Sequence, residues 1–124
     1  MAEIYYRDGL SWLSLDAIEA SLHCFQRSLD YHPGRGDALA YHAYLQFKNS
    51  PNSPRVAETC RDELRTAANI APQNPEIHVL RARFALESGL ADLAEDCLMR
   101  IRDIDPDHPD LPKLESVHEE LVQD

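Results

Sequence analysis

Long apolar runs and basic residues are both scarce in this chain of 124 residues. No stretch approaches the roughly 20 consecutive apolar residues of a membrane-spanning helix. The start, Met-Ala-Glu-Ile-Tyr-Tyr-Arg-Asp, lacks the basic segment followed by an apolar one that marks a secretory signal. Twelve Lys and Arg stand against 22 Asp and Glu, and the net charge of −10 disfavours nucleic-acid backbones and anionic membranes. We therefore expect neither a nucleic-acid nor a membrane partner.

Cysteine is also scarce, and the three cysteines are widely spaced. An odd number argues against a disulfide framework and favours a reducing, cytoplasmic location. Cys24, Cys60 and Cys97 each fall within a predicted helix, on or near its apolar stripe. We expect them to be small buried side chains rather than nucleophiles.

Patterns that signal catalysis or metal binding are missing. The chain has no glycine-rich phosphate loop, no nucleophile elbow and no pair of carboxylates in a cleft context. Its six histidines include no i, i+4 pair, and no Cys-x2-Cys is present, so a helical zinc site is not expected. We predict a protein that is not an enzyme, with no catalytic residue, cofactor or metal.

A recurring phrase is what the chain does contain. It reads Pro, two residues, Gly or Pro, then an acid, and it occurs as Pro33-Gly-Arg-Gly-Asp37, Pro72-Gln-Asn-Pro-Glu76 and Pro106-Asp-His-Pro-Asp110. The prolines of the second and third phrases are 34 residues apart, and those of the first and second 39. Proline ends the preceding helix, and an acid favours the start of the next. A period of this size indicates stacked helical repeats.

Apolar spacing at helical period predicts helices between these corners and no strand. The expected helices are 2–14, 17–31, 37–48, 55–71, 75–88, 91–104 and 109–122. Residues 49–54 read as a loop that accounts for the longer second spacing, and Gly89 is expected to supply the left-handed conformation of a turn. In the last helix an apolar stripe of Leu111, Leu114, Val117 and Leu121 is expected to cover the preceding hairpin.

These units resemble the tetratricopeptide repeat (TPR) family, whose pattern combines small and large residues on two helices with a closing proline. The first unit has Tyr5, Gly9, Trp12, Ser21, Phe25 and Pro33; the second has Leu39, Ala43, Cys60, Leu64, Ala67 and Pro72; the third has Ala82, Ala85, Gly89, Ala94, Leu98 and Pro106. His78 departs from the pattern, because a large apolar residue is usual there. The resemblance implies an all-α, TPR-like right-handed superhelix of three antiparallel helix hairpins plus a C-terminal capping helix. We expect a single domain over 1–124, with units of about 2–35, 36–74 and 75–108 and a cap at 109–122.

The resemblance also implies a concave groove lined by the first helix of each repeat. Projected onto this chain, it contains Tyr6, Arg7, Leu10, Tyr41, Tyr44, Lys48, Leu80, Arg83 and Glu87. Three bases and one acid predict a groove that is locally basic, suited to a partner peptide or helix with acidic and apolar side chains. The Lys and Asn clamp with which some TPR domains hold a terminal carboxylate is not matched, because Tyr6 and Leu10 stand there in the first unit.

The expected function is therefore a non-enzymatic adaptor or scaffold that binds a protein partner. Two alternatives stay open: a dedicated chaperone for a secreted or assembling subunit, and a regulatory TPR domain of a larger protein. The sequence leaves open whether the chain forms homo-oligomers.

Overall fold

The computed structural model describes residues 1–123, and the regular structure in that range consists of seven α-helices. They are α1 (Ala2–Ser14), α2 (Ile18–Tyr31), α3 (Gly36–Asn49), α4 (Pro54–Ile70), α5 (Pro75–Glu87), α6 (Ala91–Ile104) and α7 (Leu111–Val122). Every predicted helix is confirmed, with ends displaced by at most two residues. The all-helical, TPR-like fold class predicted from the repeats is therefore confirmed.

Corner residues explain where two of the helices begin. Pro54 and Pro75 occupy first-turn positions, where a missing N–H leaves no bond unmade. Just before them, the Ser53 hydroxyl accepts the N–H of Val56 at 3.3 Å, and the Asn74 side chain accepts the N–H of Glu76 at 3.0 Å. Each cap satisfies a backbone donor that the helix itself leaves unpaired.

Pro109 was expected to open the last helix in the same way, and this expectation is wrong. It lies in a turn, and α7 begins two residues later, at Leu111. The reason is His108, a buried residue whose Nδ1 accepts the N–H of Asp110 at 3.1 Å. This bond holds the turn through Asp110, so the helix starts only after it.

Left-handed residues close two of the hairpin turns. Gly89, between α5 and α6, has a φ of 72°, as the sequence predicted. Asp16, between α1 and α2, has a φ of 58°, a conformation that aspartate tolerates better than most residues. The turns differ in sequence but reverse the chain in the same way.

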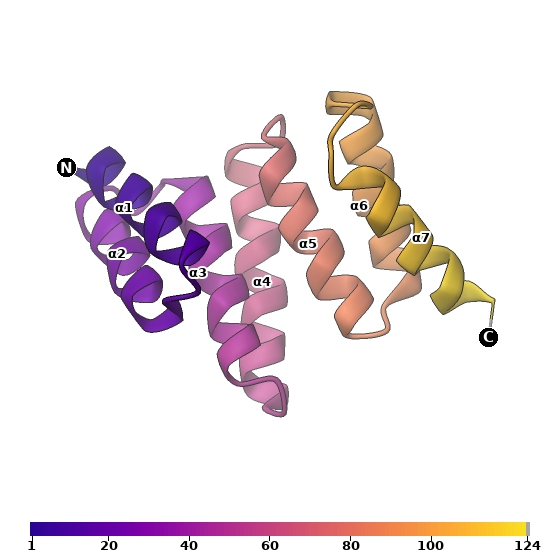
Figure 1. The fold of residues 1–124 in the computed structure, drawn as a ribbon, viewed down its shortest axis with the longest axis horizontal. Coiled ribbons are helices and arrows are strands. Elements are labelled where there is room, and N and C mark those ends of the chain that lie inside the picture. The colour runs from indigo at the N-terminus through magenta and orange to yellow at the C-terminus, as the bar shows by residue number, and fades with distance from the viewer. Residues whose placement is uncertain (124) are drawn as a thin grey trace.

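The helices stack in a row from the N-terminus to the C-terminus (Figure 1). The pairs α1–α2, α3–α4 and α5–α6 form hairpins, and contacts between neighbouring hairpins join α2 to α3, α3 to α5 and α4 to α5. Apolar side chains fill the spaces in three clusters, one for each hairpin and its neighbour. Cys24, Cys60 and Cys97 are buried free thiols, as predicted.

The distance between α1 and α2 in the first hairpin is set by a close contact between the backbone of one helix and an aromatic ring of the other. Gly9 of α1 lies against Phe25 of α2, and a Cβ atom at Gly9 would lie 2.7 Å from Cε1 of that ring. The Ser21 hydroxyl donates to the carbonyl of Gly9 at 2.9 Å, inside the same contact. Only glycine permits helices this close together at this point.

The last helix covers the third hairpin with only part of its expected stripe. Leu111 and Leu114 are buried against a cluster that includes Val79 and Ile101. Val117 is 39% exposed because it faces a pocket instead of the core. The cap therefore rests mainly on two leucines.

Among the described residues, no helix is long and apolar enough to cross a membrane.

Candidate functional site

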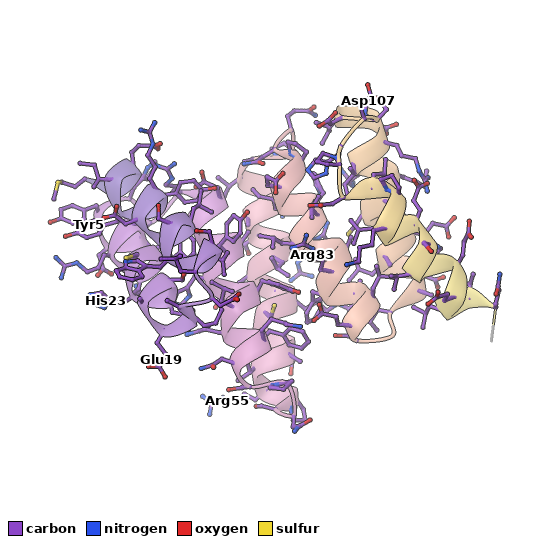
Figure 2. The ribbon with its side chains drawn as sticks, viewed as in Figure 1. Tyr5, Glu19, His23, Arg55, Arg83 and Asp107 are labelled. Carbon is purple, nitrogen blue, oxygen red and sulfur yellow. The ribbon has the colours of Figure 1, made fainter. Side chains whose placement is uncertain are left out.

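The candidate site is a pocket of about 380 Å³ between α3, α5 and α7. Its wall combines aliphatic side chains with charges of both signs. The lining residues are Tyr44, Arg83, Leu86, Glu87, Asp110, Lys113, Leu114 and Val117. Figure 2 labels Arg83 on α5, near the middle of the row of helices. The pocket thus brings together residues from the second repeat, the third repeat and the cap.

Glu87 links α3 to α5 at one end of this pocket. Its Oε1 accepts the hydroxyl of Tyr44 at 2.6 Å, and its Oε2 pairs with Lys48 Nζ at 3.1 Å. Burial, followed by the bond to this carboxylate, raises the pKa of Tyr44. Tyr44 therefore stays neutral and keeps its proton as the donor to Glu87.

Arg83 marks the other end, where it pairs with Asp110 at 3.2 Å. The position of Asp110 depends on His108, which is almost fully buried. Because the Asp110 N–H can only donate, Nδ1 of His108 accepts, and Nε2 carries the proton that is donated to Glu76 Oε1 at 2.7 Å. One neutral imidazole therefore ties the start of the cap to the start of α5.

The N-terminal half of the predicted groove is an aromatic cluster. Tyr41 stacks on Phe25 with ring centroids 5.3 Å apart, and Tyr6 meets Tyr41 edge-on at 6.2 Å. The guanidinium of Arg35 lies 4.4 Å from the centroid of Tyr6. Burial raises the pKa of Tyr41 to about 12. Leu10 packs against the same cluster.

The predicted groove residues therefore divide into two groups. Tyr6, Leu10 and Tyr41 come together around Phe25, while Tyr44, Lys48, Arg83 and Glu87 come together at the pocket and its rim. Leu80 does not line an open surface: it is 2% exposed and belongs to the core between α3, α4 and α5. Tyr44 is 7% exposed, so it offers a partner only an edge.

The locally basic groove expected from the sequence is not what the structure contains. Each predicted base has a carboxylate partner, in the pairs Arg7–Glu3, Lys48–Glu87 and Arg83–Asp110. Lys113, a pocket residue that was not among the predicted bases, forms no ion pair within residues 1–123. The surface is thus a belt of mixed charge with one unpaired cation.

Sequence reasoning missed two sets of residues at this surface. Asp110, Lys113 and Val117 come from the cap, whose stripe was interpreted only as core. Arg35 pairs with both Glu3 and Asp37 over the ring of Tyr6. The recurring phrase contains Arg35, Asp37 and Asp110, so its polar positions carried a signal for this surface as well as for the corners.

Metal ligands do not gather anywhere in the described part of the chain, which holds no group of three or more His, Cys, Asp or Glu side chains placed to bind an ion.

Residues 61–116 match the family model described as tetratricopeptide repeat. No curated protein sequence matches the chain.

Two solved TPR domains share the fold along nearly the whole chain. The first TPR of Spaghetti (RPAP3), bound to the HSP90 peptide SRMEEVD, is 11% identical with a TM-score of 0.79, and the match covers 98% of this chain and 95% of that one. The first TPR domain of human RPAP3 is 12% identical with a TM-score of 0.76, covering 99% and 96%. The family-model match over residues 61–116 and this shared fold show that the chain has the fold of a tetratricopeptide repeat domain.

Proposed function

We propose that this chain is a non-enzymatic adaptor that holds a partner segment along α1, α3, α5 and α7, with an apolar side chain of the partner seated in the pocket between α3, α5 and α7. The observation that carries the proposal is the composition of that pocket. Leu86, Leu114 and Val117 supply an apolar wall, and cationic and anionic groups stand at its edge. Such a pocket suits an anchor residue with polar neighbours, the usual arrangement at a peptide-binding site.

The charges favour acidic neighbours for that anchor. Lys113 has no intramolecular carboxylate within the described residues, so a partner carboxylate can pair with it directly. Arg83 is already paired, but both members of its pair are well exposed. Exposed ion pairs contribute only about 0–1 kcal/mol, so exchange of Asp110 for a partner acid costs little.

The structural neighbour supports a partner of this chemistry. The peptide bound by the Spaghetti domain, SRMEEVD, combines acidic residues with Met and Val. In this chain, however, Tyr6 and Leu10 are packed into the aromatic cluster. They offer no cation to a terminal carboxylate, so we propose recognition of an internal acidic and apolar segment rather than of a chain end.

The test uses fluorescence anisotropy with a labelled peptide of alternating Glu and Leu residues, and a matched peptide with Lys in place of Glu. Lys113→Glu and Arg83→Glu are the pocket variants. Arg65→Glu, an exposed residue of α4 that pairs only with Asp62 among residues 1–123, is the control with the same charge change. We expect the Glu peptide to bind, and each pocket variant to weaken that binding at least fivefold, which corresponds to the loss of one exposed ion pair of about 1 kcal/mol.

The wild-type chain should bind the Lys peptide more weakly than the Glu peptide. The proposal fails if the two pocket variants bind the Glu peptide as well as Arg65→Glu does. For Tyr44 the replacement to test is phenylalanine, which removes only the hydroxyl that donates to Glu87. Alanine would also open a cavity in the core beneath the groove, so its effect on binding could not be separated from a loss of stability.

A further inference from the structure

A second exposed surface lies on the outward side of α1, away from the groove. The opposite side of this helix packs on α2 through Gly9 and Leu13. The outward side presents Trp12, which is 45% exposed, and Ile4 near the N-terminus of the helix. Leu15, the residue directly after the helix, is 71% exposed and lines the same hollow as Trp12. Large apolar side chains gathered on one exposed face are typical of interaction surfaces.

A hollow of about 340 Å³ interrupts this apolar face, lined by Asp8, Ser11, Trp12 and Leu15. Asp8 forms no ion pair in the part of the chain that the structure describes. Ser11 donates its hydroxyl proton to the carbonyl of Arg7 at 3.1 Å, so its oxygen remains free to accept. The hollow therefore offers a carboxylate, a hydroxyl acceptor, an indole ring and an aliphatic wall.

We propose that this hollow binds an arginine or lysine side chain of a basic, amphipathic partner segment. A cation is attracted both by Asp8 and by the ring of Trp12. Its aliphatic stem packs against Leu15, as the stems of Lys and Arg do on apolar surfaces. Apolar neighbours of the cation would then rest on Ile4 and the rest of the face.

The charge of the whole chain selects this occupant over a second copy of the protein. A net charge of −10 attracts a basic segment, and it repels another chain of the same charge. Self-association through α1 would also bring two copies of Asp8 toward one apolar contact. The adaptor would thus carry two binding surfaces of different chemistry, one for an acidic segment and one for a basic segment.

Trp12 is the single tryptophan of the chain, so its emission reports on this hollow directly. The probe is a synthetic amphipathic helical peptide with leucines at i, i+3 and i+7 and one central arginine; its match has glutamine in place of arginine. We expect the arginine peptide to shift the emission of Trp12 and the glutamine peptide to do so only at severalfold higher concentration.

Asp8→Asn should weaken binding about threefold, as the loss of one exposed ion pair does, and Asp8→Lys by about tenfold or more. The control is Asp107→Asn, which removes the same charge at the α6–α7 corner (Figure 2) and should bind like wild type. Equal binding of the two peptides, or equal effects of Asp8→Asn and Asp107→Asn, would overturn the proposal. So would a dimer in sedimentation equilibrium that Leu15→Glu dissolves, because the second copy would then be the occupant.

Discussion

Replacing Gly9 with alanine should destabilise the protein, although Gly9 lies inside a helix where alanine is normally the better residue. In a helix interior, Ala is favoured over Gly by about 0.8–1.0 kcal/mol. The new Cβ, however, would lie 2.7, 2.8 and 2.9 Å from three carbons of the Phe25 ring. These distances are well below the carbon–carbon optimum of roughly 3.5–4.0 Å.

The ring of Phe25 has little room to move away. It is fully buried, with Tyr41 stacked on it at 5.3 Å and Tyr6 tilted against it at 5.8 Å. Overpacking of this kind costs about 1–3 kcal/mol. After the helix-propensity gain of about 1 kcal/mol is subtracted, we expect a net loss of about 1 kcal/mol of unfolding free energy for Gly9→Ala.

A double-mutant cycle separates the two effects. Phe25→Leu removes the ring, so Gly9→Ala in that background should become neutral or stabilising, by up to about 1 kcal/mol. The unfolding free energies of the four proteins are measured by urea titration followed by circular dichroism. Gly34→Ala is the control: its Cβ would meet only the His32 ring at an ordinary 3.6 Å, so stability should hardly change.

The expected coupling between Gly9 and Phe25 is about 1–3 kcal/mol, equal to the overpacking cost. A coupling below about 0.5 kcal/mol is the value seen for independent sites. Such a result would mean that α1 and α2 separate freely at this contact, and it would refute the argument that glycine sets their distance.

Three further predictions concern the rest of the fold. Burial lowers the pKa of His78 below its ordinary 6.5, so as the pH falls the unfolded chain takes up a proton before the folded chain does. The unfolding free energy should therefore fall as the pH drops below about 6.5. Urea titrations at several pH values should show this slope in the wild type and a flatter slope in His78→Leu. Leu114→Ala should lower the unfolding free energy by about 2–5 kcal/mol, because this leucine of the cap is buried against the third hairpin. Val117→Ala should lower it by less than about 1 kcal/mol, because Val117 is exposed. Equal melting temperatures for the two variants would contradict this role of the cap. Burial raises the pKa of Cys60 to about 12, so a thiol reagent should label it only after unfolding in urea, and rapid labelling of the native protein would show that the second hairpin opens.

Local signals in the sequence determined the helices and their corners. Pro75 and Gly89 act through their own backbone geometry, which is the same in any surroundings, so their positions were predictable. The spacing of the phrases likewise predicted a stack of hairpins, because a hairpin of this size must bury its apolar face on a neighbour.

The surface of that stack was decided only by the tertiary structure. Arg83 looked like a free groove cation until the fold placed Asp110, 27 residues later, beside it. Leu80 was expected in the groove but is buried in the core, and Val117 was expected in the core but lines the pocket. Helical period indicates which residues share a face, but what that face meets depends on how neighbouring helices pack, and this is set by contacts between residues far apart in the chain.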